Sequence, residues 1–373
     1  MSTRAPASLA WFPLVPRPRP PGIPLQMRIA ELVALATSTD LGSRQERATH
    51  AAKVLNKAAL IASDCGVPVL ARSLCRRQFE LFVQSAPLPR WAVKLALQPV
   101  LNIPRQLIRD GHGDDARTAL ETLYTAAISQ TTAVIDGMRI DFGALTSTAD
   151  GRKEACTLTW TALLADGIRA LAQSGRWKEA ADHAAAYRGT GARLLDGRQA
   201  SILALLTDKQ PAEAAQMVNQ SNVAEPWEQT VQAVLRVLCQ RTAREDTNPG
   251  IATMTDATLT LAQVQVPGTA VIRARILMTA LTLAGEVTQA PVIREALITA
   301  ANADAYVARD LLACQHANWP LTNAQRSQLQ ALVSASGLDA GTIPRHLLRQ
   351  LTSATDRAGS IVAREIGTSR NPA

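Results

Sequence analysis

Aromatic residues are scarce in this chain of 373 residues, where Phe, Trp and Tyr together make up only 3%. Proteins that bind single-stranded nucleic acid stack bases on such side chains, so the shortage argues against that class. No run of about 18 apolar residues occurs, and a membrane-spanning helix is therefore not expected. The apolar stretch near the start is broken by Pro6, Pro13 and Pro16, whereas a signal peptide needs an unbroken apolar core. We expect a cytoplasmic protein that does not bind membranes.

Cysteine is also rare, with five residues at Cys65, Cys75, Cys156, Cys239 and Cys314. Their number is odd and no two are spaced as Cys-x-x-Cys, so neither a disulfide framework nor a zinc module is indicated. We expect free thiols, most of them buried, in a reducing compartment.

Basic residues are dispersed, although the net charge is +8 and the pI is about 9.6. Part of the excess lies near the start, at Arg4, Arg17, Arg19 and Arg28. Domains that bind nucleic acid concentrate Lys and Arg on one face. The sequence therefore predicts a mildly basic surface and no direct contact with nucleic acid.

The motifs of common catalytic sites are missing: Gly-x-Ser-x-Gly, Gly-x4-Gly-Lys-Ser/Thr and His-Glu-x-x-His do not occur. Gly189-Thr190-Gly191 follows an expected helix, where a dinucleotide-binding turn requires a strand, and we interpret it as a helix stop. His112, Asp114 and Asp115 offer metal ligands, but carboxylates at this place favour a helix N-terminus. Neither a metal nor a cofactor is predicted.

Alanine and leucine, the strongest helix formers, are abundant, and we expect an all-α protein. Within residues 165–218 one helical pattern occurs twice at an offset of 34 residues. The first copy centres on Ser174-Gly175-Arg176-Trp177 and the second on Thr207-Asp208-Lys209-Gln210-Pro211. Part of the same pattern, around Gly111, lies 64 residues before Gly175. An offset near 34 is typical of tetratricopeptide repeats, each an antiparallel pair of helices.

The segment from Gly175 to Ala181 also resembles the junction between the two helices of a tetratricopeptide repeat. This resemblance implies a right-handed α-solenoid of antiparallel helix pairs with a concave surface. The order of motifs is similar to that of a largely uncharacterised group of actinobacterial helical-repeat proteins, from about residue 45 to the end. The matching pieces are residues 62–66, 107–111, 175–177 and 194–199. That similarity implies no assigned activity and no functional residues.

Seven prolines, of which Pro24 is the last, mark residues 1–26 as a disordered or polyproline tail. A translation start at Met27 is an alternative interpretation, and residues 16–21 are a candidate ligand for an aromatic groove of a partner. We expect helical repeats over residues 27–129, with a capping box formed by Ser43 and Glu46. Pro99 and Pro104 should kink or split the helix that covers residues 91–110.

Residues 130–152 interrupt the helical pattern. Asp136-Gly137 lies between two short apolar runs and predicts a small inserted β-hairpin near residues 131–142. A C-terminal set of helical repeats, continuous with the first, is expected over residues 153–373. Thr322 and Gln325 predict a second capping box there.

The candidate partner-binding residues lie in two polar stretches. In the first, a helix starting at Gly191 would bring Arg193 and Asp196 onto one face, while Arg198 would diverge unless the helix bends at Gly197. The full set of candidates is Arg193, Asp196, Arg198, Gln199, Arg109 and Asp110. A weak surface ion pair is the alternative explanation. Trp177, after the turn at Gly175, is expected to be a buried packing anchor.

Three functions are compatible with these features. The leading hypothesis is a non-enzymatic helical-repeat scaffold that binds a protein or peptide partner in its concave groove. The second is a regulatory protein that senses a peptide or ligand and acts with a separate DNA-binding partner. The third, an enzyme, is the least favoured because no convergent catalytic groups are found. It would use Arg193, Asp196 and Arg198 facing Arg109 and Asp110 across a groove.

Overall fold

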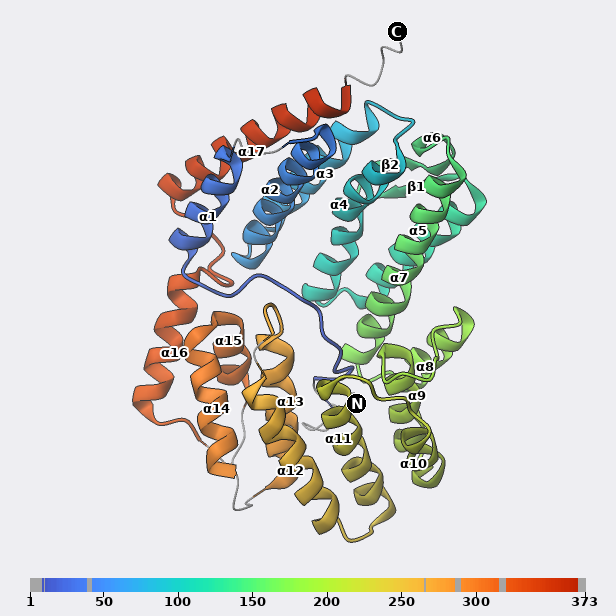
Figure 1. Ribbon diagram of the computed structural model, residues 1–373, viewed down its shortest axis with the longest axis vertical. Coiled ribbons are helices and arrows are strands. Elements are labelled where there is room, and N and C mark those ends of the chain that lie inside the picture. The colour runs from blue at the N-terminus through green and yellow to red at the C-terminus, as the bar shows by residue number, and fades with distance from the viewer. Residues whose placement is uncertain are drawn as a thin grey trace. The chain divides into compact units, whose positions relative to one another are not determined.

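The structure of the protein is a computed structural model that describes residue 9 and residues 11–38, 42–264, 266–285, 290–314 and 320–367. These residues form seventeen helices and one two-stranded antiparallel sheet (Figure 1). The chain divides into two compact units. Unit 1 contains Met1–Ile23 and Ile168–Ser336, and unit 2 contains Pro24–Gly167 and Gly337–Ala373. The predicted all-α class with one β-hairpin is confirmed.

Unit 2 begins with a run of helices and includes the sheet and the last helix. Its elements are α1 (Leu25–Thr37), α2 (Arg44–Asp64), α3 (Pro68–Val83), α4 (Arg90–Arg109), α5 (Gly113–Ser129), β1 (Thr132–Ile135), β2 (Met138–Asp141), α6 (Phe142–Leu145) and α17 (Arg345–Gly367). The boundary between the units falls within α7 (Ala149–Gln173).

Unit 1 contains the remaining helices. These are α8 (Trp177–Ala186), α9 (Asp196–Thr207), α10 (Pro211–Asn219), α11 (Pro226–Ala243), α12 (Asn248–Gln263), α13 (Ala270–Ala284), α14 (Ala290–Ala303), α15 (Ala305–Ala313) and α16 (Asn323–Ser336). Helices that follow one another in the chain pack together from α8 to α16.

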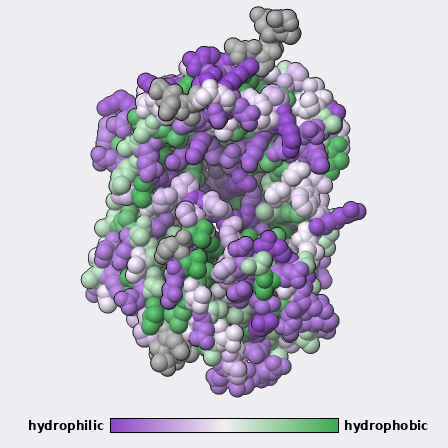
Figure 2. All heavy atoms as spheres, viewed as in Figure 1, coloured by the Kyte–Doolittle hydropathy of each residue, from purple (hydrophilic) through white to green (hydrophobic). Residues whose placement is uncertain are grey.

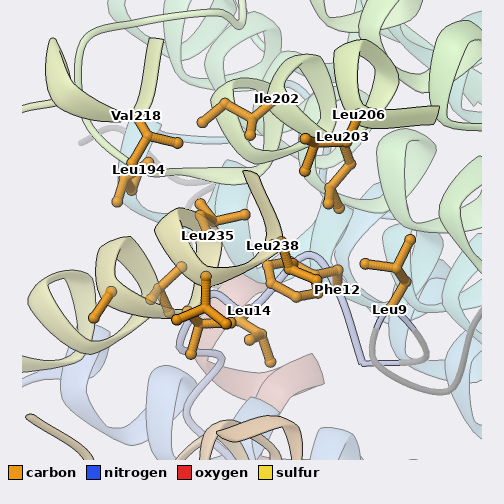
Figure 3. Packing of buried hydrophobic residues seen from close by; sticks show 14 of the residues in the cluster. Leu9, Phe12, Leu14, Leu194, Ile202, Leu203, Leu206, Val218, Leu235 and Leu238 are labelled. Carbon is orange, nitrogen blue, oxygen red and sulfur yellow. The ribbon is translucent and has the colours of Figure 1, made fainter. Parts of the chain in front are cut away.

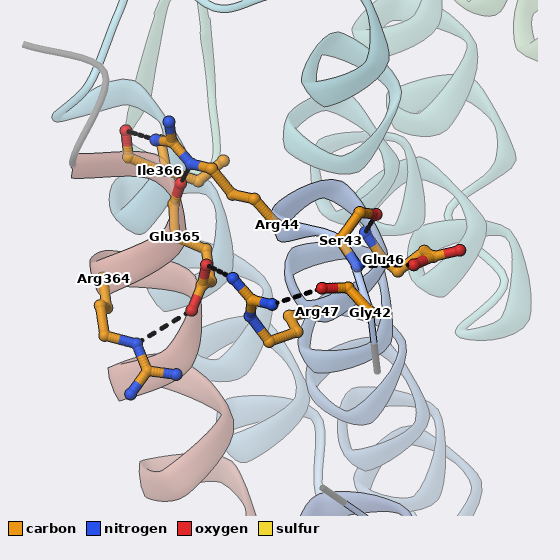
Figure 4. Close-up of polar contacts among 8 residues, drawn as sticks. All are labelled: Gly42, Ser43, Arg44, Glu46, Arg47, Arg364, Glu365 and Ile366. Carbon is orange, nitrogen blue, oxygen red and sulfur yellow. Dashed lines mark hydrogen bonds and ion pairs between the residues drawn. The ribbon is translucent and has the colours of Figure 1, made fainter. Parts of the chain in front are cut away.

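This division differs from the predicted segments 27–129, 130–152 and 153–373. The last helix, α17, packs on α1 and α2, so residues 345–367 belong to the same unit as the first helices. Arg47 on α2 pairs with Glu365 on α17 at 2.8 Å, and Arg44 Nη2 donates to the carbonyl of Ile366 at 3.0 Å (Figure 4). The hydrogen bond from Arg47 holds the pKa of Glu365 below its ordinary value. These contacts join segments about 320 residues apart in sequence, which local patterns do not reveal.

One turn connects helices at four places in the chain. In each, a residue with positive φ follows the first helix, and the next helix begins two residues later, at Pro68, Gly113, Trp177 and Pro211. The four positive-φ residues are Gly66, Gly111, Gly175 and Lys209. Three are glycines because only glycine adopts this backbone conformation without a steric cost.

The hydrogen bonds of this turn are also the same. The residue after the positive-φ position donates its N–H to the carbonyl five residues earlier, as in a Schellman motif. For Arg176 the acceptor is Leu171, at 3.1 Å, and for Gln210 it is Leu205, at 2.8 Å. The sequence repeat with an offset of 34 residues thus corresponds to a repeated turn between helices.

The predicted β-hairpin is confirmed. Ile135 pairs with Met138, so Asp136 and Gly137 form the two-residue turn. Both residues have positive φ, which is the conformation that favours Asp-Gly in a tight hairpin. The capping box of Ser43 and Glu46 is confirmed at the start of α2 (Figure 4), and Thr322 and Gln325 exchange the equivalent hydrogen bonds before α16.

Of the two effects predicted for the prolines, a kink or a split, the split does not occur in α4. It is assigned as one helix from Arg90 to Arg109 with Pro99 and Pro104 inside. Pro99 has no N–H to donate to the carbonyl of Leu95. The buried side chain of Gln78 on α3 donates to that carbonyl instead, at 3.1 Å. The lost helical hydrogen bond is therefore replaced by a contact from the neighbouring helix.

Residues 1–26 were predicted to be a disordered or polyproline tail that does not pack, but the described part of this segment packs on the helices of unit 1. Leu9, Phe12 and Leu14 are buried in the core of unit 1, and Leu14 is completely shielded from solvent (Figure 3). They pack among side chains of α9 and α11 such as Leu203 and Leu235. Proline prevents this segment from forming a helix, but it does not prevent an extended segment from packing on helices.

The face of the molecule drawn in Figure 2 is mostly hydrophilic, and hydrophobic residues occur in small groups between the polar ones. Among the described residues, the exposed large hydrophobic side chains are Met27, Val69, Ile128, Val134, Leu195, Val266 and Val292. None of the described helices combines the length and the apolar character needed to cross a membrane.

Candidate functional site

An extended segment of the chain lies on the helices of unit 1. We call residues 11–23 the N-terminal segment; from Leu14 until α1 begins at Leu25 it contains neither helix nor strand. Pro16, Pro18, Pro20 and Pro21 have no N–H group. The segment therefore has few backbone N–H donors, and its buried backbone groups need hydrogen-bond partners outside regular secondary structure.

The first such partner is Gln199 on α9. The backbone N–H of Leu14 donates to Gln199 Oε1 at 2.7 Å, and Gln199 Nε2 donates to the carbonyl of Leu14 at 3.1 Å. A further hydrogen bond from Nε2 to the carbonyl of Leu194, at 2.6 Å, fixes the orientation of the amide. Gln199 is fully buried. One side chain thus satisfies both backbone groups of one residue in the segment.

A second backbone contact of the same kind lies eight residues further along, at Gly22. Its N–H donates to Asp304 Oδ2 at 3.0 Å, and its carbonyl accepts from the N–H of Ala305 at 2.8 Å. Asp304 is the N-cap of α15, where Oδ1 accepts the N–H of Tyr306 at 2.8 Å. A Cβ atom on Gly22 would lie 2.8 Å from atoms of Asp304, Ala305 and Tyr306. Only glycine fits at this position without a shift of the backbone.

Between these two contacts, two arginines of the segment also bind side chains of unit 1. Arg17 Nη2 pairs with Asp196, at the start of α9, at 2.8 Å. The guanidinium carbon of Arg19 lies 3.5 Å from the centre of the buried Tyr306 ring, which is a cation–π contact. The N–H of Arg19 also donates to the carbonyl of Gly268 at 3.4 Å.

Gly268 permits this approach because a Cβ atom there would lie 3.2 Å from Pro18. We name the residues that hold the segment the segment site: Asp196, Gln199, Gly268, Asp304 and Tyr306. They come from α9, α15 and the turn before α13. The segment is therefore recognised by backbone hydrogen bonds, one ion pair and one cation–π contact, in addition to the burial of Phe12 and Leu14.

Two of the predicted partner-binding residues, Asp196 and Gln199, belong to the segment site. The reason for Gly197 between them is packing, because a Cβ atom there would lie 2.4 Å from the carbonyl oxygen of Gly189. The chain after α8 and the first turn of α9 are thus in close contact.

Arg193 does not share a helix face with Asp196. The helix does not start at Gly191 but at Asp196, because Arg193 forms a β-bridge with Asn222, whose N–H donates to the carbonyl of Ala192 at 2.9 Å. Arg193 does not pair with Asp196, and its guanidinium binds both carboxylate oxygens of Glu228 at 3.0 and 3.1 Å.

Glu228 is completely buried at the start of α11. Burial alone would raise its pKa, but hydrogen bonds from Arg193 and from the N–H groups of Ala224 and Glu225 outweigh this effect and hold the pKa below its ordinary value. The Arg193–Glu228 pair therefore ties the loop before α9 to the start of α11.

Arg198 also makes internal contacts. It donates to Ser221 Oγ at 2.7 Å and to the carbonyls of Met217 and Gly191 at 2.8 and 3.0 Å. These acceptors lie at the end of α10 and in the loop before α9. Arg198 thus fixes the position of α9. None of these three hydrogen bonds involves the N-terminal segment.

The last two candidates, Arg109 and Asp110, lie in unit 2 at the end of α4. Arg109 Nη1 donates to Ser63 Oγ at 2.6 Å and pairs with Asp64 at 3.2 Å. Asp110 lies 3.7 Å from Arg72 on α3. These pairs connect the ends of helices within that unit.

Sequence reasoning missed Leu14, Gly22, Gly268, Asp304 and Tyr306. An N-cap was identifiable at Asp304, since a residue of this type precedes a helical pattern. Nothing in the local sequence links it to Gly22, because the two residues are 282 positions apart.

Groups suited to metal or thiolate chemistry do not assemble in the described residues. No cluster of three or more His, Cys, Asp or Glu side chains with the geometry of a metal site is found in this part of the chain. All five cysteines are free. Burial raises the pKa of the Cys65 thiol to about 11 and that of Cys75 to about 12, so neither is a thiolate at neutral pH.

Comparison with known proteins gives no family: no family model, no curated protein and no solved structure matches this chain.

Proposed function

We propose that this protein is a non-enzymatic scaffold of antiparallel helix pairs, arranged as a right-handed α-solenoid, that binds an extended segment of a protein partner. The partner lies along the helices that carry the segment site, in the concave groove of unit 1. Specificity comes from groups that recognise peptide backbone and from a small number of side-chain pockets.

The observation that carries this proposal is the way the N-terminal segment is held. Gln199 binds the N–H and the carbonyl of Leu14, and Asp304 and Ala305 bind those of Gly22. Paired main-chain hydrogen bonds of this kind provide affinity in known modes of peptide recognition, while alternate side chains provide specificity. A surface that binds one extended segment in this way is suited to bind another of similar chemistry.

The repeated turn supports the solenoid. Four helix pairs are joined by the same hydrogen-bonded connection, and stacked helix pairs of one geometry produce extended concave surfaces.

Affinity capture from a native extract with three baits tests the proposed function. The baits are the full chain, the chain without residues 1–23, and that shortened chain with Gln199→Ala. We expect a stoichiometric partner on the shortened chain, less of it on the full chain, and none on the Gln199→Ala variant. Equal capture by all three baits, or turnover of a small molecule by a chain that captures no partner, would contradict the proposal.

A further inference from the structure

The N-terminal segment has the features of a ligand. Its prolines restrict it to extended conformations before it is bound, so little conformational entropy is lost on binding. In sequence, the segment is separated from the rest of unit 1, which begins again at Ile168, by residues 24–167 of unit 2. Its contacts with α9 and α15 are therefore long-range in sequence, at 185 and 282 residues.

The contacts define which positions of a ligand are selected. Position 12 and position 14 take hydrophobic side chains, since Phe12 and Leu14 are buried among apolar residues of unit 1. Position 17 takes a cation because it faces the Asp196 carboxylate at 2.8 Å. Position 19 takes a cation because it lies over the Tyr306 ring. Position 22 takes glycine because Asp304, Ala305 and Tyr306 leave no room for a Cβ atom.

We propose that the segment site is specific for extended polypeptides of the form hydrophobic-x-hydrophobic-x-x-Arg-x-Arg-x-x-Gly, and that the N-terminal segment is its intramolecular ligand. This inference rests on the proposed function. A partner that carries the pattern must displace the N-terminal segment, which competes at an effective concentration on the order of mM because it is tethered. Binding of the partner is thereby coupled to release of residues 11–23.

The test uses the full chain with a flexible linker and a protease site inserted between Ile23 and Pro24. The probe is a fluorescent synthetic peptide with the sequence of residues 9–24, and its binding is followed by anisotropy before and after cleavage. We expect the cleaved chain to exchange its segment for the probe and to remain folded. Before cleavage, apparent affinity should be at least about tenfold lower, because the tethered segment occupies the site.

Variants of the probe test the pattern. Arg17→Glu and Gly22→Ala in the peptide should each reduce affinity by about tenfold or more, since the first places like charges together and the second introduces a clash. Pro21→Ala, at an exposed position, is the matched control and should change affinity less than about twofold. Asp196→Lys in the chain should restore binding of the Arg17→Glu peptide.

Three results would overturn the inference. In the first, the probe does not exchange and removal of the cleaved segment unfolds unit 1, which makes the segment a permanent part of the core. In the second, the probe binds, but the Asp196→Lys substitution in the chain does not restore binding of the Arg17→Glu peptide. In the third, light scattering shows that the uncut chain is a dimer that exchanges segments between copies.

The peptide-binding test and the capture experiment can fail independently of each other. Capture of a partner that lacks the pattern would leave the proposed function standing and remove this inference. Pattern-dependent binding of the probe, without any captured partner, would support this inference and contradict the proposed function.

Discussion

At the scale of single residues, the contacts of long polar side chains separate those that hold the N-terminal segment from those that hold the fold. Asp196 and Gln199 face the segment, whereas Arg193 and Arg198, only a few positions away, bind Glu228, Ser221 and backbone carbonyls. The sequence predicted that this polar stretch is important. It did not predict which side chain faces which way, because the orientation follows from the start of α9 at Asp196 and not at Gly191.

Trp177 tests the packing of unit 1. It follows the turn at Gly175 and is buried with only 2% of its surface exposed, as predicted. Trp177→Ala should lower the free energy of unfolding of unit 1 by about 3–5 kcal/mol, the range for truncation of a large buried side chain. Leu195→Ala, at an exposed position, is the control and should change it by less than about 0.5 kcal/mol. Denaturant unfolding of the two variants decides the matter, and an unchanged midpoint for Trp177→Ala would contradict the packing role.

Glu228 makes the stability of unit 1 depend on pH. Its pKa is lower in the folded chain than in the unfolded chain, where a glutamate titrates near about 4.3. The stabilisation is therefore fully present above that value and is lost as the pH falls through the lowered pKa. Glu228→Gln should reduce stability at neutral pH and flatten the pH dependence in this acidic range.

Denaturant unfolding at a series of pH values down to about pH 3 measures this effect. Glu225→Gln, at the adjacent exposed N-cap, is the control for loss of a carboxylate at the start of α11. Parallel pH profiles for the wild-type chain and the Glu228→Gln variant would show that Arg193 does not stabilise the charged form.

At the scale of elements, local sequence rules predicted the structure well wherever the determinants lie within a few residues. The hairpin turn at Asp136-Gly137, the capping box at Ser43 and the turn at Gly175 each depend on backbone preferences of the residues present. The continuity of α4 through its prolines depends on a tertiary contact that local rules do not contain: Gln78 on another helix binds the carbonyl that Pro99 leaves without a donor. A helix from Gly191, considered as a possibility, does not form for a similar reason, since Asn222 pairs with the backbone of Arg193.

A substitution at Gly22 tests whether the start of α15 holds the end of the N-terminal segment. Gly22→Ala introduces a Cβ atom 2.8 Å from three atoms at the start of α15 and should weaken this end of the segment by about 1–3 kcal/mol. Cleavage of residues 9–23 by a protease of broad specificity, followed by mass spectrometry, should be faster in this variant.

The matched control is Gly191→Ala, because no atom lies within 4 Å of a Cβ built at Gly191. It should be cleaved at the rate of the wild-type chain. Equal cleavage of the Gly22→Ala variant and the wild-type chain would mean that the contacts with Asp304 and Ala305 do not restrain the segment.

At the scale of the whole molecule, the division into units and the place of the N-terminal segment were not predictable from the sequence. Composition predicted a disordered or polyproline tail for residues 1–26, and residues 14–24 indeed contain neither helix nor strand. What orders these residues is a set of partners 179 to 282 positions away, and no local signal identifies such partners. The same applies to α17, whose contacts with α2 lie about 320 residues apart.

Hydrogen exchange of the backbone amides of residues 9–23, resolved to single residues, tests most directly whether unit 1 holds the segment as an extended ligand. In the native full chain the amides of Leu14 and Gly22 should exchange slowly, because both are buried and hydrogen-bonded to side chains of unit 1. In Gln199→Ala the amide of Leu14 should exchange fast, while Gln216→Ala, at an exposed position of α10, should leave it slow. Fast exchange of Leu14 and Gly22 in the unmodified chain would contradict the account.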